Sequence, residues 1–121
     1  MARNPRQLQG RWAEQRALRL LQQAGWQLLS RNWQCRWGEL DLVLCKPGRL
    51  LLVEVKGRGA GSFDGVGVAS LRRPKQLRLE RAWACWLAAH GEWAEQPVEQ
   101  VAALVPLPPL RGAVRWIRLG R

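Results

Sequence analysis

Three charged residues on two neighbouring stretches of the chain have types and spacing that suit phosphodiester hydrolysis. Asp41 lies in residues 38–45, and Glu54 and Lys56 lie in residues 50–56. Carboxylate oxygens are preferred ligands of Mg²⁺, which keeps several waters and needs only one or two protein carboxylates. Lys56 is two residues from Glu54, so in a strand both side chains share a face. There the lysine could orient or deprotonate an attacking water, while the cation supplies Lewis acidity.

A hairpin between the two stretches would bring the acidic residues together. Residues 46–49 read Lys-Pro-Gly-Arg, which is typical of a turn. In a hairpin centred on the Pro-Gly bond, paired residues have numbers that sum to 95, which places Asp41 opposite Glu54 and Glu39 opposite Lys56. Directly opposed side chains lie about 4.5–5.5 Å apart at Cβ. Two carboxylates at that distance repel each other, so we expect Mg²⁺ or Mn²⁺ as the cofactor that offsets the repulsion.

The alternation of apolar residues supports the first strand of this hairpin. Leu40, Leu42 and Leu44 are expected to face one way and Asp41 the other. An odd-length loop would break the direct pairing of the two acids. The alternative is a solvated hairpin face, in which Glu39 pairs with Lys56 and the remaining acids point to water.

A third carboxylate could come from the N-terminal helix. Leu18 and Leu21 follow Glu14 at helical spacing, so Glu14 lies at the border of the apolar face. A helix packed on the sheet could aim Glu14 at the site as a catalytic residue and metal ligand. The alternative is an ordinary surface glutamate.

The remaining patterns predict an α/β fold in which helices flank a central sheet. Helices are expected over residues 6–24 and 74–90, and strands over 26–33, 38–45, 50–55, 98–105 and 114–119. Residues 57–67 contain five glycines and are expected to form a loop, either a flexible connector or a lid over the site. The whole chain, 1–121, is expected to be one domain with a basic, proline- and arginine-rich segment at 106–121.

The charge of the chain points to a polyanionic partner. The net charge is +11, and all of the twenty basic residues except Lys46, Lys56 and Lys75 are arginines. The planar guanidinium group of arginine can donate two hydrogen bonds to one phosphate, so the simplest partner is nucleic acid. A basic housekeeping surface, or contact with an anionic membrane or the ribosome, is the alternative. The eight tryptophans could stack on unpaired bases, but most are expected in the core or at its rim.

Targeting and cysteine signals place the chain in the cytoplasm. No apolar run is long enough to span a bilayer. Residues 1–6 lack the apolar core of a signal peptide. The three cysteines are odd in number and form no Cys-x-x-Cys pair, which argues against a zinc site or a disulfide framework. We therefore expect a cytoplasmic protein that does not cross a membrane.

Several short motifs together resemble the YraN family, whose members are similar to the PD-(D/E)XK nucleases and archaeal Holliday junction resolvases. The matching residues are Ala13-Glu14-x-x-Ala17, Arg31-Asn32, Gly38-Glu39-Leu40-Asp41-Leu42, Val53-Glu54-Val55-Lys56-x-Arg58, Phe63 and Lys75. The resemblance covers about residues 9–90. Where the family has Arg-Phe-Asp on a later strand, this chain reads Pro-Val-Glu-Gln-Val at 97–101.

The resemblance implies a restriction-endonuclease-like core, a mixed sheet flanked by helices. It implies that Asp41 and Glu54 are metal ligands, that Lys56 is the catalytic lysine, and that Glu14 is the acid from the helix. Junction resolvases use two active sites, so by analogy this chain could form a homodimer.

Three functions follow from these patterns. The first is a Mg²⁺-dependent endonuclease acting on DNA, with basic residues near the site holding the backbone: Arg58, Arg72, Arg73, Lys75 and Arg78. The second is a nucleic-acid-binding module of the same fold without catalytic activity. The third is an adaptor that binds a protein partner through exposed tryptophans.

Overall fold

A five-stranded mixed sheet with a helix on each face forms the core of the protein. The computed structural model describes residues 4–59 and 73–119. The elements in chain order are α1 (Pro5–Gln23), β1 (Gln27–Cys35), β2 (Gly38–Lys46), β3 (Arg49–Arg58), α3 (Arg73–Ala89), the 3₁₀ helix η1 (Gly91–Trp93), β4 (Val98–Pro106) and β5 (Arg115–Arg118). The strands lie in the order β1-β2-β3-β4-β5. Only β3 and β4 pair in parallel; the other neighbours are antiparallel.

This architecture confirms the predicted α/β class and mixed sheet. The expected helices and strands are all present, with ends that differ by a few residues. The largest difference is in β3, which continues to Arg58 instead of ending at Val55, because its parallel pairing with β4 runs as far as Arg58–Pro106. Most of the expected glycine-rich loop lies outside the described residues.

Helix α1 begins at a side-chain cap and packs closely on the sheet. The Asn4 side chain accepts a hydrogen bond from the Gln7 amide at 2.8 Å, and the Gln7 side chain accepts one from the Asn4 amide at 3.2 Å. This reciprocal pair satisfies amides at the helix start that have no partner within the helix. Ala13 and Ala17 are fully buried, so small side chains let α1 approach the strands.

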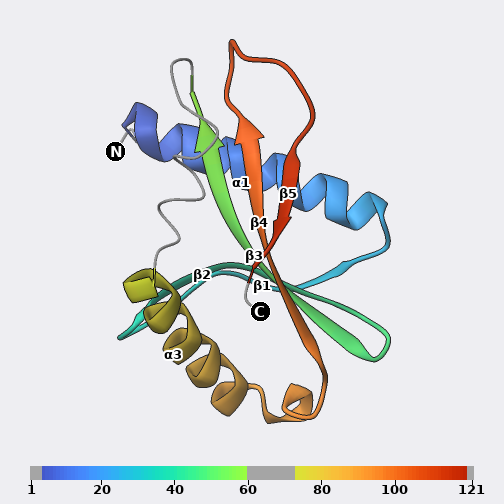
Figure 1. Ribbon diagram of the computed structural model, residues 1–121. Helices are drawn as coiled ribbons and strands as arrows, with labels where there is room; N and C mark the ends of the chain where they lie inside the picture. The colour runs from blue at the N-terminus through green and yellow to red at the C-terminus, as the bar shows by residue number, and fades with distance from the viewer. Residues whose placement is uncertain (1–3, 60–72, 120–121) are drawn as a thin grey trace.

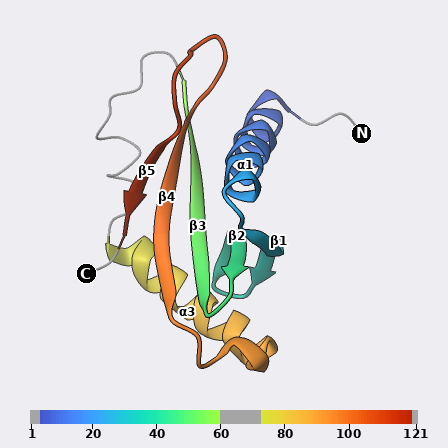
Figure 2. The same ribbon diagram turned by 90° about the vertical axis from the view of Figure 1, so that its right-hand side faces the viewer.

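The two helices cover opposite faces of the sheet (Figures 1 and 2). Helix α1 packs on Leu42, Leu44, Leu51 and Val53, whereas α3 packs on the face that includes Val43 and Leu52. The central residue of the α3 side is Trp86, which has no exposed surface and donates a hydrogen bond from Nε1 to Ser30 Oγ at 2.9 Å. No helix among the described residues is long and apolar enough to cross a membrane.

The β2–β3 hairpin has the predicted register in its outer half. Lys46 pairs with Arg49 across a two-residue turn, and the pairing continues to Leu42–Val53. Gly48 has φ +78°, which suits the third residue of a turn with proline in the second position. The predicted direct pairing of Asp41 with Glu54, and of Glu39 with Lys56, is wrong, since the ladder ends at Leu42.

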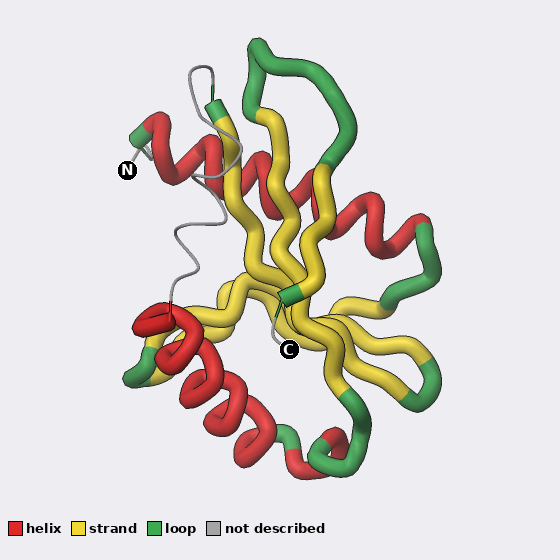
Figure 3. Tube along the Cα trace, viewed as in Figure 1, coloured by secondary structure: helices red, strands yellow, loops and turns green. Residues whose placement is uncertain are grey.

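The strands of the sheet bend along their length, as Figure 3 shows. On the β1 side the ladder passes from Arg31–Leu42 to Trp33–Leu40, and Asn32 between them has φ +52°. Leu40 was expected on the same face as Leu42, but it packs with Val43 on the α3 side. The left-handed backbone of Asn32 interrupts the regular alternation of the strands here.

Candidate active site

A cleft of about 400 Å³ opens where the ladder between β2 and β3 ends. Four elements contribute to it: α1, β2 with the turn before it, β3 and α3. The lining residues are Gly10, Ala13, Glu14, Trp37, Gly38, Glu39, Asp41, Glu54, Val55, Lys56, Gly57, Lys75, Arg78, Leu79 and Ala82. The structure thus brings Glu14, Asp41, Glu54 and Lys56 to one cleft, as the sequence analysis predicted.

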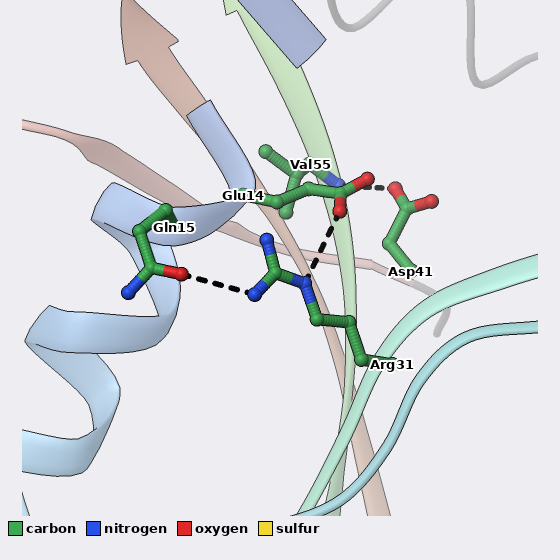
Figure 4. Close-up of polar contacts among 5 residues, drawn as sticks. All are labelled: Glu14, Gln15, Arg31, Asp41 and Val55. Carbon is green, nitrogen blue, oxygen red and sulfur yellow. Dashed lines mark hydrogen bonds and ion pairs between the residues drawn. The ribbon is translucent and has the colours of Figure 1, made fainter. Parts of the chain in front are cut away.

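Asp41 replaces the missing ladder pairs with a side-chain contact. Its Oδ2 accepts a hydrogen bond from the Val55 amide at 2.8 Å (Figure 4). This bond satisfies a part-buried backbone donor at the position where β2 and β3 separate. It also fixes the Asp41 carboxyl group beside the backbone of β3, between Glu54 and Lys56.

Glu54 is the one charged side chain in the described part of the chain that is buried, with 5% of its surface exposed. Burial, then the charge of Asp41 and a side-chain hydrogen bond with Asp41, raise the pKa of Glu54 to about 9. The nearby Lys75 and Lys56 lower that pKa in part. Without a cation, Glu54 therefore holds a proton near neutral pH and forms a hydrogen bond with the Asp41 side chain. The two acids meet although their residues do not pair in the ladder.

Lys56 lies on the same strand as Glu54, and Lys75 approaches it from α3. Burial lowers the pKa of Lys56, and the hydrogen-bonding contact and positive charge of Lys75 lower it further, whereas Glu54 and Asp41 raise it. The contact with Lys75 thus makes Lys56 easier to deprotonate. An amine in this setting can exchange a proton with a water in the cleft more readily than an exposed lysine can.

Glu14 reaches the cleft from α1 and is held by β1 (Figure 4). Its Oε1 lies 3.6 Å from Arg31 Nε, which is too long for a hydrogen bond, and Arg31 Nη1 donates to Gln15 Oε1 at 3.0 Å. Burial raises the pKa of Glu14, and a hydrogen bond from Asn32 opposes that rise. Glu14 Oε1 is buried without a hydrogen-bond partner.

The donor set of the cleft fits a hard divalent cation. Asp41 and Glu54 supply carboxylate oxygens that repel each other when both are ionised, and Glu14 supplies a buried oxygen that accepts no hydrogen bond and lies 3.6 Å from Arg31 Nε. Mg²⁺ prefers such ligands and fills its remaining positions with water. Among the described residues no three acidic, histidine or cysteine side chains are close enough to form a ready-made cage. The acidic pair is thus the expected anchor for the ion.

The predicted backbone-binding residues fall into three groups. Lys75 and Arg78 line the cleft from the first turns of α3. Arg58 ends β3, is partly buried and does not line the cleft. Arg72 lies outside the described residues, and for Arg73 the structure describes only the backbone position at the start of α3.

Three residues of the site were not predicted to act there. Glu39 lines the cleft, and burial followed by the charges of Asp41 and Glu14 raises its pKa. Asn32 hydrogen bonds with Glu14. Trp37 lines the mouth of the cleft. The sequence offered a signal for two of them, since Glu39 and Asn32 belong to the short motifs, but their contacts depend on the bend of the sheet.

Comparison with known proteins identifies relatives over most of the chain. A family model described as "Uncharacterised protein family UPF0102" matches residues 13–105. A UPF0102 protein of Prochlorococcus marinus (strain MIT 9303) is 56% identical over 110 residues, which cover 91% of this chain and 87% of that protein. A UPF0102 protein of Synechococcus sp. (strain CC9902) is 50% identical and covers 93% of both chains. A UPF0102 protein of Bordetella avium is 41% identical over 95% of this chain and 75% of its own.

Proposed function

The chain belongs to the UPF0102 family, as the YraN resemblance predicted, and we propose that its cleft is the active site of a cytoplasmic, Mg²⁺-dependent endonuclease. The proposed substrate is DNA, and the proposed reaction is hydrolysis of a phosphodiester bond. The order of the strands around the site, with the helix that carries Glu14 on one face, supports a restriction-endonuclease-like core.

One observation carries this proposal. A buried acid, Glu54, lies in one cleft with Asp41 and Lys56, and its raised pKa and the lowered pKa of Lys56 agree with that placement. Such an arrangement is destabilising in a purely structural role, because a buried carboxyl group without compensation weakens folding. Groups with strongly shifted pKa values that converge in a cleft are typical of active sites.

The residues that line the cleft would have different roles according to where they lie. Asp41 and Glu54 would hold the cation, which when bound supplies Lewis acidity and activates water for attack, and Glu14 would add negative charge beside them. Lys56, which lies on β3 with Glu54, would orient that water and accept a proton from it. Lys75 and Arg78 would hold the phosphate backbone at the edge formed by α3, because their side chains supply positive charge next to the acids.

Cleavage assays test this proposal with matched variants. The purified chain is incubated with labelled four-way junction, flap and duplex DNA in Mg²⁺, Mn²⁺ or EDTA. Cleavage should require the cation, and D41N and K56M should each reduce it by about a hundredfold or more. E80Q removes an exposed carboxylate from α3 outside the cleft and should cleave like the unaltered chain. Cleavage that persists in D41N would contradict the assignment of the site.

A catalytically silent nucleic-acid-binding module is the second candidate. The observation in its favour is that the described residues hold no three protein ligands close enough to form a cage. This reading expects tight DNA binding at low salt, no cleavage, and no heat of Mn²⁺ binding in calorimetry. Heat of Mn²⁺ binding that disappears in D41N would decide for the endonuclease.

A further inference from the structure

A tryptophan at the mouth of the cleft lies against two arginine side chains. The ring of Trp37 has the guanidinium carbon of Arg36 at 4.7 Å from its centroid and that of Arg81 also at 4.7 Å. Arg36 and Trp37 come from the turn between β1 and β2, and Arg81 comes from α3. Trp37 itself lines the cleft. We propose that these three residues form a subsite for backbone phosphate of the nucleic-acid strand that lies in the cleft.

The electrostatics of the two arginines favour a bound anion. Their guanidinium carbons are separated by at most twice the distance from each carbon to the ring centroid, so the two positive charges repel. Within residues 4–59 and 73–119 neither guanidinium group forms an ion pair, and both side chains are exposed. The tryptophan ring stabilises each cation and limits the directions that it can take. Backbone phosphate bound beside the two guanidinium groups would offset this repulsion.

The position of this subsite assigns a path to the strand. The acidic residues line the cleft together with Lys75 and Arg78. Arg36 and Arg81 contact Trp37, which lines the same cleft, so phosphates outside the reacting bond would lie across α3 and the turn between β1 and β2. This inference rests on the proposed function, because it concerns the substrate of the same cleft. It adds the phosphate contacts that hold the chain next to the cleavage position.

The protein contains a matched control for this arrangement. Trp26 has Lys46 Nζ at 4.8 Å and the guanidinium carbon of Arg49 at 4.9 Å from its ring centroid. These residues surround the turn between β2 and β3, which lies at the right of Figure 1, whereas the turn between β1 and β2 lies at the left beside α3. Strand β2 separates the two ends by roughly 25 Å. Two cations on one tryptophan are thus present both at the cleft and far from it.

The test compares DNA binding by two double variants of equal charge. Binding of labelled single-stranded and duplex DNA is followed by fluorescence anisotropy in EDTA, over a series of NaCl concentrations. R36Q/R81Q should weaken binding by about tenfold and reduce the slope of log affinity against log salt by about 0.7–1 for each lost phosphate contact. K46Q/R49Q should weaken binding much less. Equal losses from the two double variants would overturn the subsite.

A second pair of variants tests the role of the ring as a positioning residue. W37F keeps an aromatic face for the arginines and should retain most of the salt slope. W37L keeps both arginines but removes the face, so its salt slope should fall toward that of R36Q/R81Q. A W37L chain with an unchanged slope would overturn this role. Because all binding is measured without metal, absence of cleavage would contradict only the endonuclease, and equal double-variant losses only the subsite.

Discussion

Asp41 has two separable properties, a negative charge and a hydrogen-bond acceptor. The acceptor satisfies the Val55 amide at the point where the ladder between β2 and β3 ends. The charge acts on Glu54, whose pKa it raises. A substitution that removes one property and keeps the other can therefore separate the structural role of this residue from its proposed catalytic role.

The D41A and D41N variants should differ in stability. D41A leaves the Val55 amide without its acceptor and should lower the free energy of unfolding by about 1–3 kcal/mol. D41N keeps an acceptor oxygen and removes the charge next to Glu54, so its metal-free stability should equal or exceed that of the unaltered chain. Urea denaturation in EDTA at pH 8 measures both. If D41N were destabilised as strongly as D41A, the two properties would not be separable as described.

Glu54 makes the metal-free protein sensitive to pH. Its pKa is raised from 4.5 to about 9 in the folded state, so the folded chain holds a proton that the unfolded chain has released. Between these values the unfolded state binds fewer protons, and stability falls as pH rises. E54Q cannot lose a proton. The gain in stability of E54Q over the unaltered chain should therefore be small below pH 4.5 and grow steadily toward pH 9 in thermal denaturation.

The same measurement has a control and a contrary outcome. E80Q removes an exposed carboxylate on α3, and its stability difference should stay constant over this pH range. Mn²⁺ should raise the melting temperature of the unaltered chain more at pH 8.5 than at pH 6, because the ion displaces the proton of Glu54. If the difference in stability between E54Q and the unaltered chain did not change with pH, the proton assigned to Glu54 in the folded chain would be contradicted.

At this scale the sequence predicted the central residues but not their exact contacts. The turn at residues 46–49 and the alternation before it were enough to predict that Asp41 lies near Glu54 and Lys56. The contact of Asp41 with the Val55 amide could not be predicted, because it depends on where the ladder ends. Trp37 carried no local signal, since its arginine partners come together only when α3 packs on the sheet.

At the scale of elements, α1 brings Glu14 to the cleft by packing tightly on the sheet. Ala13 and Ala17 are fully buried against the strands, and Glu14 follows Ala13 directly. The distance between α1 and the sheet therefore sets how far the Glu14 carboxyl group reaches into the cleft. The helix periodicity correctly predicted Ala13, Ala17 and Leu21 on this face, because apolar spacing within one helix is a local property. Leu20 and Ala24 were predicted there as well but are exposed.

Enlarging Ala17 should move α1 away from the sheet. A17L adds a branched side chain to a fully buried position and should lower the free energy of unfolding by about 1–3 kcal/mol through overpacking. It should also weaken Mn²⁺ binding, because Glu14 moves with the helix. Urea denaturation and calorimetry measure the two effects. A88L, at an exposed position of α3, should change neither, and normal stability of A17L would contradict the close packing.

The bend of the sheet marks the limit of sequence reasoning about elements. Strict alternation placed Leu40 with Leu42, but the backbone of Asn32 at φ +52° and the end of the β2–β3 ladder send Leu40 to the α3 face. Asparagine tolerates this backbone region better than most residues, yet the sequence gives no sign that Asn32 uses it. The position of β4 beside β3 similarly depends on packing between distant segments.

At the scale of the whole molecule, a strongly basic chain carries a cleft lined by several acids. The net charge of +11 favours polyanions in general, whereas the carboxyl groups of Asp41 and Glu39, which line the cleft, oppose a phosphate there in the absence of a cation. For the proposed endonuclease, affinity would come from the basic residues, and a divalent ion would let phosphate approach the acids.

Salt should weaken DNA binding strongly if this division is correct. In EDTA, raising NaCl from about 50 to 200 mM should reduce the affinity for duplex DNA by at least about tenfold, because counterions compete with every arginine–phosphate contact. Anisotropy titrations at several salt concentrations give the slope. D41N should bind DNA more tightly than the unaltered chain in EDTA, since it removes a repulsive charge. A salt-independent affinity would contradict the electrostatic account.

The most direct test of the central claim is to locate a cation in the cleft. Crystals of the unaltered chain soaked in Mn²⁺ at pH 8 are measured at a wavelength where manganese scatters anomalously, and crystals of D41N are treated in the same way. The account predicts one anomalous peak within coordination distance of the Asp41 and Glu54 carboxylates, about 2.0–2.3 Å, which is absent from D41N. An ordered cleft with no peak between these carboxylates at saturating Mn²⁺ would contradict it.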